Sequence, residues 1–221
     1  GLTAINLALP IFSLVNGSGL MIGMGGGTKY TLAVSRGKQQ EGNKIFTNTL
    51  YMTAIFGIVF VILGIFFSGN IATLLGADEQ VMANTEIYLK MLLIFSPAFI
   101  LNNIVQCFVR NDGAPHLSMI AMIVGSMSNM FLDWLFIFPF GMGMFGAVLA
   151  TCLSPVFSLI LTMQYFIRKK NTFHVVKTKI SGKPIGGIIA SGFPSFLTEI
   201  STGIVLIVFN FLFMEIAGNT G

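Results

Sequence analysis

The sequence predicts an all-α integral membrane protein with six transmembrane helices, and three observations lead to this prediction. Only 9% of the 221 residues are charged, whereas a typical soluble domain has about 25%. Hydrophobic residues make up 54% of the chain, and the mean hydropathy is +0.85. Six apolar runs are also long enough to cross a bilayer, which takes about 20 residues. Together these features exclude an ordinary soluble enzyme, a disordered chain and a nucleic-acid-binding protein.

The six runs are too long for β-strands, and none alternates between polar and apolar residues as the strands of outer-membrane barrels do. Their content of glycine and proline suits membrane helices. The predicted spans are approximately residues 5–28, 46–67, 88–108, 117–140, 144–167 and 188–216.

The distribution of basic residues predicts the orientation of these spans. Six spans make the connections alternate between two sides, and 11 of the 12 Lys and Arg residues then fall on one side. Only Lys90 lies on the other side, together with Asp78, Glu79 and Glu86. Because cytoplasmic loops carry an excess of Lys and Arg, we expect the loops after the first, third and fifth spans to be cytoplasmic.

The longest connection, residues 168–183, contains six of the basic residues. Its length and charge allow two interpretations, a hinge between two halves of a larger molecule or an ordinary cytoplasmic loop. The sequence starts just before an apolar run already in progress and stops in a loop-like stretch, 217–221. We therefore expect the chain to be part of a longer protein.

Asp133 is the main functional candidate, because ionisable side chains inside a membrane are costly and rare. Asn129 precedes it by four residues, so both side chains share one face of the fourth span. A carboxylate and an amide oxygen one turn apart are suitable ligands for a small hard cation. Two alternatives remain open. Asp133 carries a proton at the working pH, or it is structural and hydrogen-bonded to a neighbouring helix or to Trp134.

The fifth and sixth spans hold further polar candidates. A polar stripe on the fifth span is either functional or a small-residue packing face, and consists of Thr151, Ser154, Ser158 and Thr162. In the sixth span, Pro194 removes a backbone hydrogen bond and should bend the helix like a hinge. Glu199 follows in the cytoplasmic half of that span. It is either a functional carboxylate or an interfacial group paired with a loop lysine.

The remaining motifs have mainly structural interpretations. The stretch 110–115 predicts a tight turn that leads directly into the next helix. The glycine-rich stretch 17–27 allows close helix approach or hinge bending, and it lacks the preceding strand and the lysine of a nucleotide-binding loop. Cys107 and Cys152 are expected to be small buried hydrophobic side chains. No catalytic constellation is visible, so we expect neither an enzyme nor a resident cofactor.

In their order and spacing, several segments resemble the MATE (multidrug and toxic compound extrusion) family of transporters. The resemblance covers nearly the whole chain. It rests on the family's second helix, the turn between its fourth and fifth helices, and its helices five, six and seven. The matching segments are 9–17 with 23–28, 110–115, 129–136, 146–151 and 191–199.

The resemblance implies helices two to seven of a twelve-helix fold that consists of two six-helix lobes. Residues 1–167 would then belong to the N-terminal lobe, 168–183 would be a basic cytoplasmic loop between the lobes, and 184–221 would be the first helix of the C-terminal lobe. The lobes of this family alternate between outward-facing and inward-facing states.

The resemblance also implies a function, the export of amphipathic and often cationic drugs in exchange for Na+ or H+. The family's cation site uses an Asn and an Asp one turn apart on helix five and a Thr on helix six, which match Asn129, Asp133 and Thr151. These would be the Na+ ligands, and a further Asp of the site would precede residue 1. Some members place an essential Glu on helix seven. Glu199 is the candidate for this second coupling site, although its spacing from Pro194 is shorter than the Pro–Glu spacing expected for those members.

The expected partners are drug-like small molecules and the lipid of a bacterial or archaeal cell membrane, with no nucleic acid and no obligatory protein partner. One alternative is a lipid-linked oligosaccharide flippase of the same superfamily. Flippases usually hold a pyrophosphate with cationic residues inside their cavity, whereas no Lys or Arg lies deep in a predicted span. A membrane enzyme would need a polar catalytic cluster, and a purely structural bundle would leave Asp133 without a role.

Overall fold

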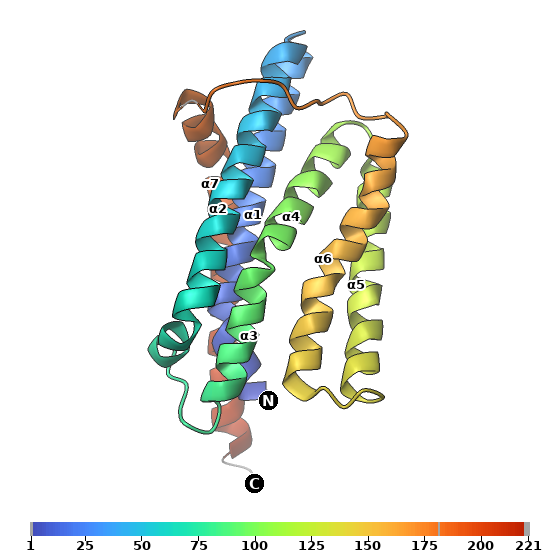
Figure 1. The fold of residues 1–221 in the computed structure, drawn as a ribbon. Coiled ribbons are helices and arrows are strands. Elements are labelled where there is room, and N and C mark those ends of the chain that lie inside the picture. The colour runs from blue at the N-terminus through green and yellow to red at the C-terminus, as the bar shows by residue number, and fades with distance from the viewer. Residues whose placement is uncertain (1, 181, 219–221) are drawn as a thin grey trace.

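A computed structural model describes residues 2–180 and 182–218, and this part of the chain is helical without strands (Figure 1). Its helices are α1 (Leu2–Ser35), α2 (Gln39–Leu74), α3 (Met82–Ile94), α4 (Ser96–Asn111), α5 (Pro115–Ile137), α6 (Gly143–Ile167) and α7 (Gly182–Gly218). Five of the described helices are long and apolar enough to cross a membrane, and α3 with α4 gives a sixth candidate if this bent pair is one span. The predicted all-α membrane fold is confirmed.

The connections gather at two opposite ends of the bundle. The α1–α2 loop, the α4–α5 turn and the long segment before α7 lie at one end, at the top of Figure 1. The α2–α3 and α5–α6 connections lie at the other end. The first end, called here the basic end, carries the Lys- and Arg-rich loops. The structure therefore agrees with the predicted grouping of basic loops, while their cytoplasmic placement stays a prediction.

The third predicted span is not one continuous helix, which the sequence analysis did not anticipate. Helix α3 ends at Ile94, α4 begins at Ser96, and the two axes are bent by 46°. Pro97 accounts for the break. It has no N–H to donate to the carbonyl of Leu93, and its ring would clash with that carbonyl in a regular helix. The Ser96 side chain is fully buried at the bend, and its hydroxyl oxygen has no hydrogen-bond partner.

Helix α1 packs against α7 by direct contact of the two backbones. A Cβ atom added to Gly192 on α7 would overlap the carbonyl oxygen of Met21 on α1. A Cβ atom added to Gly25 on α1 would likewise overlap the carbonyl oxygen of Ile188. Each helix therefore needs glycine where the other backbone approaches, and the predicted role of the glycine-rich stretch is confirmed at Gly25.

Helices α5 and α6 form a hairpin beside the other helices (Figure 1). The Ser154 hydroxyl donates to the carbonyl oxygen of Gly125 on α5 at 2.8 Å. The Ser158 hydroxyl oxygen accepts from Nε2 of Gln106 on α4 at 2.7 Å, and Ser118 donates to Oε1 of the same glutamine at 2.7 Å. These contacts support the packing interpretation of the polar stripe for its two serines.

Residues 168–180, called here the strap, cross the basic end from α6 to α7 (Figure 1). The N–H groups of His174 and Val176 donate to side-chain oxygens of Asn43 and Thr47 on α2, each at 3.0 Å. The spacing fits because two extended residues advance by about 6.6 Å and four helical residues by about 6 Å. The strap is thus laid along α2 over this stretch.

An aromatic cluster fixes the strap at Phe173, which is 1% exposed. The ring lies among four others, with centroid distances of 4.7 Å to Phe46, 5.4 Å to Phe108, 5.5 Å to Phe166 and 5.9 Å to Tyr30. These rings come from α1, α2, α4 and α6. The cluster therefore ties the strap to the helices of the first 167 residues.

Asp112 adds a polar anchor beside this cluster. Its carboxylate accepts from the Thr172 N–H at 2.8 Å and from the Tyr165 hydroxyl at 3.0 Å. The Thr172 hydroxyl also donates to it, and Tyr30 donates to it at 3.3 Å. The predicted turn is present, with φ of +93° at Gly113 and Pro115 at the start of α5.

Candidate functional site

The predicted cation ligands lie on the two helices of the α5–α6 hairpin. Asn129 and Asp133 are one turn apart on α5, and Thr151 is on α6. The structure adds Tyr88 of α3, a side chain that is 8% exposed. Its hydroxyl interacts with the side chain of Thr151, and Asp133 is close enough to act on it electrostatically. Three helices therefore contribute polar groups to this site, and the half-buried Asp133 supplies its charge.

The amide of Asn129 is incompletely satisfied. Its Nδ2 atom is buried and has no hydrogen-bond partner, a condition shared in the described part of the chain only by the Ser96 hydroxyl. Leaving a buried polar group unpaired costs about 1–3 kcal/mol, so such groups point to a function or to a missing partner. By contrast, the hydroxyl of Thr151 donates to the carbonyl of Ala147 at 3.1 Å. Because that bond uses the Thr151 proton, the Thr151 oxygen acts as an acceptor, toward the Tyr88 hydroxyl and with one lone pair left for a cation.

The donor set suits a single positive charge. One carboxylate, one amide and two hydroxyl groups offer oxygen ligands, which hard cations prefer over nitrogen or sulfur. No cluster of three or more His, Cys, Asp or Glu side chains that could hold a metal ion occurs among the described residues. Because Asp133 brings one negative charge, either a bound Na+ or a proton on its carboxyl group would neutralise the site.

Glu199 lies at a separate place, on α7 against α1. The side-chain amide of Asn16 donates to Oε1 of Glu199 at 2.8 Å, and Asn103 donates to Oδ1 of Asn16 at 2.8 Å. This chain of hydrogen bonds links three helices, so the alternative pairing with a loop lysine is not what the structure has. Helix α7 runs without interruption through Pro194, and the bend predicted there stays a prediction.

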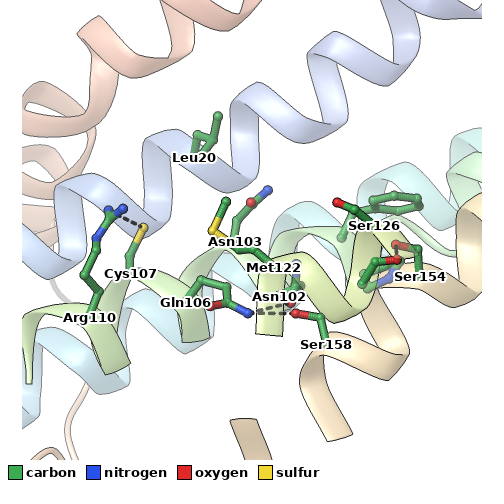
Figure 2. A pocket seen from close by; sticks show the side chains of 13 residues that line it. Leu20, Asn102, Asn103, Gln106, Cys107, Arg110, Met122, Ser126, Ser154 and Ser158 are labelled. Carbon is green, nitrogen blue, oxygen red and sulfur yellow. Dashed lines mark hydrogen bonds between the residues drawn. The ribbon is translucent and has the colours of Figure 1, made fainter. Parts of the chain in front are cut away.

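A cavity of about 270 Å³ opens between α1, α4, α5 and α6 (Figure 2). Its polar lining includes Asn102, Asn103, Gln106, Ser126, Ser154 and Ser158. Arg110 lies at one end of the lining, on the last turn of α4, and Ser126 lies toward the other end (Figure 2). The apolar part of the wall includes Leu20, Phe99, Met122 and Pro155.

Sequence reasoning missed Tyr88, Asn16 and the anchoring role of Asp112. A tyrosine at the edge of a predicted span indicates an interfacial anchor, and Asp before Gly indicates a turn. Neither pattern reveals a partner that is distant in sequence. Asn16 did carry a usable signal, because an amide within an apolar run is a functional candidate by the argument that singled out Asp133.

A bundle of long apolar helices with polar side chains gathered between them is an architecture of membrane transporters. The chain belongs to the MatE family, whose model matches residues 1–135. A protein of Staphylococcus saprophyticus named multidrug export protein MepA is 33% identical over 220 residues, which are 99% of this chain and 49% of that protein. The protein of that name from Staphylococcus aureus strain MRSA252 is 30% identical over the same shares. The chain thus spans about half the length of the curated relatives it matches.

Solved structures of MATE transporters share the fold. An inward-facing structure matches with a TM-score of 0.84 at 22% identity, covering 92% of this chain and 47% of that one. An outward-facing structure matches with a TM-score of 0.81 at 24% identity, covering 93% and 46%. A MATE structure in complex with MaL6 matches with a TM-score of 0.86 at 24% identity, covering 96% and 48%. At these identities the likeness concerns the fold alone.

Proposed function

We propose that the protein containing this chain is a multidrug exporter that uses Na+ or H+ entry to move amphipathic, often cationic, compounds outward by alternating access. Membership of the MatE family and the two relatives named as multidrug export proteins support the transport of drugs. We expect its long apolar helices to be embedded in the lipid bilayer. The expected location is a bacterial or archaeal cell membrane, with the basic end in the cytoplasm.

The observation that carries the coupling proposal is that Tyr88 of α3 hydrogen-bonds with Thr151 of α6 and lies within the electrostatic influence of Asp133 of α5. A cation that neutralises Asp133 changes the electrostatics of the contact between α3, α5 and α6. Drug and cation then favour different states of the transporter, and their exchange drives export without ATP. Asn129 would contribute its amide oxygen, one turn from Asp133, whereas its partnerless Nδ2 is a donor that needs an acceptor rather than a cation.

The division into lobes belongs to the same proposal. Residues 1–167 form most of the N-terminal lobe, 168–183 connect the lobes, and 184–221 begin the C-terminal lobe. Glu199 is then a second coupling group, supported by its bond to Asn16 across the α1–α7 contact. Pro194 is the proposed hinge of α7, about one and a half turns from Glu199 and close to the backbone contact at Gly192.

The test is drug efflux from cells or vesicles that contain the complete protein, normalised to its amount in the membrane, under imposed Na+ and H+ gradients. Asp133→Asn keeps the side-chain volume but removes the charge, so it should abolish gradient-driven efflux while the protein still inserts. Asn129→Ala and Thr151→Ala each remove one neutral ligand, and their losses should be smaller, about 5- to 10-fold. Efflux by Asp133→Asn that responds normally to the gradients would refute the coupling role.

A further inference from the structure

The strap is bound at its start to residues that all precede it in the sequence. The Thr172 N–H donates to the Asp112 carboxylate at 2.8 Å, and the Thr172 hydroxyl donates to the same carboxylate. The side-chain amide of Gln39 donates to the carbonyl oxygen of Thr172 at 2.9 Å. The next residue, Phe173, is 1% exposed within its aromatic cluster. The docking of the strap is therefore a property of the first 167 residues.

The strap then follows one face of α2 (Figure 1). Strap residues 174, 176 and 178 each bond to an α2 side chain, and these are Asn43, Thr47 and Tyr51. In the third of these bonds the Tyr51 hydroxyl donates to the carbonyl oxygen of Thr178 at 3.4 Å. Because the three α2 residues follow one another at intervals of four, they share one helix face. The contact with α2 thus extends to Thr178.

This docking leaves only a short free connection to α7. Three residues, 179–181, lie between Thr178 and Gly182, the first residue of α7. Four steps of extended chain span at most about 14 Å. If the strap were free from the end of α6, the fifteen steps from Ile167 to Gly182 would span at most about 54 Å. Docking therefore shortens the reach of the connection about fourfold.

The beginning of α7 is also a place where α7 and α1 touch. Ile188 is six residues after Gly182, and its carbonyl oxygen occupies the position that a Cβ atom on Gly25 would need. If the two proposed lobes separate at the basic end, this part of α7 has to move away from α1. Such a movement also stretches the connection between the strap and α7.

We propose that the docked strap limits how far the lobes separate at the basic end. The strap moves with α1–α6 as one body, and only residues 179–181 change conformation when α7 moves. The start of α7 then stays within about 14 Å of Thr178 in every state. Asp112 and Phe173 are positioning residues, because they act through the strap. This inference rests on the proposed alternating access, and it confines the hinge interpretation of residues 168–183 to their last few members.

The distance between spin labels on Gln40 of α2 and Gly186 of α7 tests this limit in the complete, otherwise cysteine-free protein. Both positions are exposed, and distances would be recorded with and without drug and Na+, and at low pH. In Phe173→Ala the longest distances should exceed the wild-type maximum by at least about 10 Å, since the reach of the connection grows by about 40 Å. Val175→Ala is the control, because its side chain is 67% exposed, and it should give the wild-type distribution.

A second variant keeps the strap docked and lengthens the connection. Insertion of six Gly and Ser residues after Ile180 should also extend the distances, and it does so without altering Asp112 or Phe173. This variant decides the question if Phe173→Ala fails to insert. Wild-type distances in the insertion variant would overturn the inference. Wild-type distances in a Phe173→Ala protein whose strap is detached by hydrogen exchange would overturn it too.

A disulfide between cysteines at positions 47 and 176 fixes the strap to α2, since Thr47 and Val176 are in direct contact. The oxidised protein should export drug as fast as the reduced protein, because the strap does not have to leave α2. Loss of export on oxidation, restored by reduction and absent from the single variant Thr47→Cys, would overturn the inference. If neither form exports drug but the spin-label distances change as expected, the proposed function fails and the limit stands.

Discussion

Replacing Phe173 by alanine should release the strap from α2. The ring is 1% exposed and lies within 6 Å of four other aromatic rings, the closest being Phe46 at 4.7 Å. Truncation of a buried phenylalanine costs about 3–5 kcal/mol. Because 1.4 kcal/mol corresponds to a tenfold change in an equilibrium constant, the detached strap should become at least about 100 times more populated.

Hydrogen exchange measures this population directly. The N–H groups of His174 and Val176 are hydrogen-bonded to Asn43 and Thr47, so they exchange when the strap detaches. In Phe173→Ala their exchange should accelerate by about 100-fold, while the protein stays inserted and the buried helices keep their protection.

Val175→Ala provides the control for this experiment. Val175 is in the same strap, but its side chain is 67% exposed. Its truncation removes little packing, so exchange at the neighbouring amides should change by less than about threefold. Wild-type exchange rates in Phe173→Ala would refute the claim that the aromatic cluster holds the strap in place.

Three further predictions concern orientation and helix contacts. A cysteine introduced at Gln40 should be labelled from the cytoplasm and one at Gln80 from outside, both positions being exposed; the reverse pattern would overturn the orientation. Gly192→Ala should lower the unfolding free energy by about 1–3 kcal/mol because its Cβ meets the α1 backbone. Gly186→Ala should leave the unfolding free energy unchanged, because no atom lies within 4 Å of the added Cβ. Equal melting temperatures of the two variants would contradict the close packing at Gly192. Glu199→Gln keeps an acceptor for the α1 amide, so it should melt at a higher temperature than Glu199→Ala; the opposite order would contradict that hydrogen bond.

Most of the fold could be predicted from the sequence, because each span is long and apolar and the basic residues lie in every second loop. The break between α3 and α4 was missed, although Pro97 lies within the predicted span. A proline inside an apolar run is compatible with a kinked span as well as with two helices. The 46° bend depends on what packs around it.

The arrangement of the strap could not be predicted, because it depends on contacts between residues far apart in sequence. Asn43 and Thr47 look like ordinary polar residues at the start of α2, and Phe173 like an apolar residue in a basic loop. Their roles follow only once the strap lies beside α2. In the candidate site, spacing on one helix predicted that Asn129 and Asp133 share a face. Tyr88 enters from another helix, which no local pattern could indicate.

The central claim is that Asp133 couples drug export to a cation, and the drug affinity of the purified complete protein tests it most directly. Affinity would be measured with and without Na+ at fixed pH, and over a pH range without Na+, for the wild type and for Asp133→Asn. If cation and drug favour different states, the wild-type affinity should fall when either Na+ or H+ binds, and the coupling is reciprocal. Asp133→Asn should bind drug with an affinity that no longer depends on either cation. A normal dependence on Na+ or pH in Asp133→Asn would contradict the account.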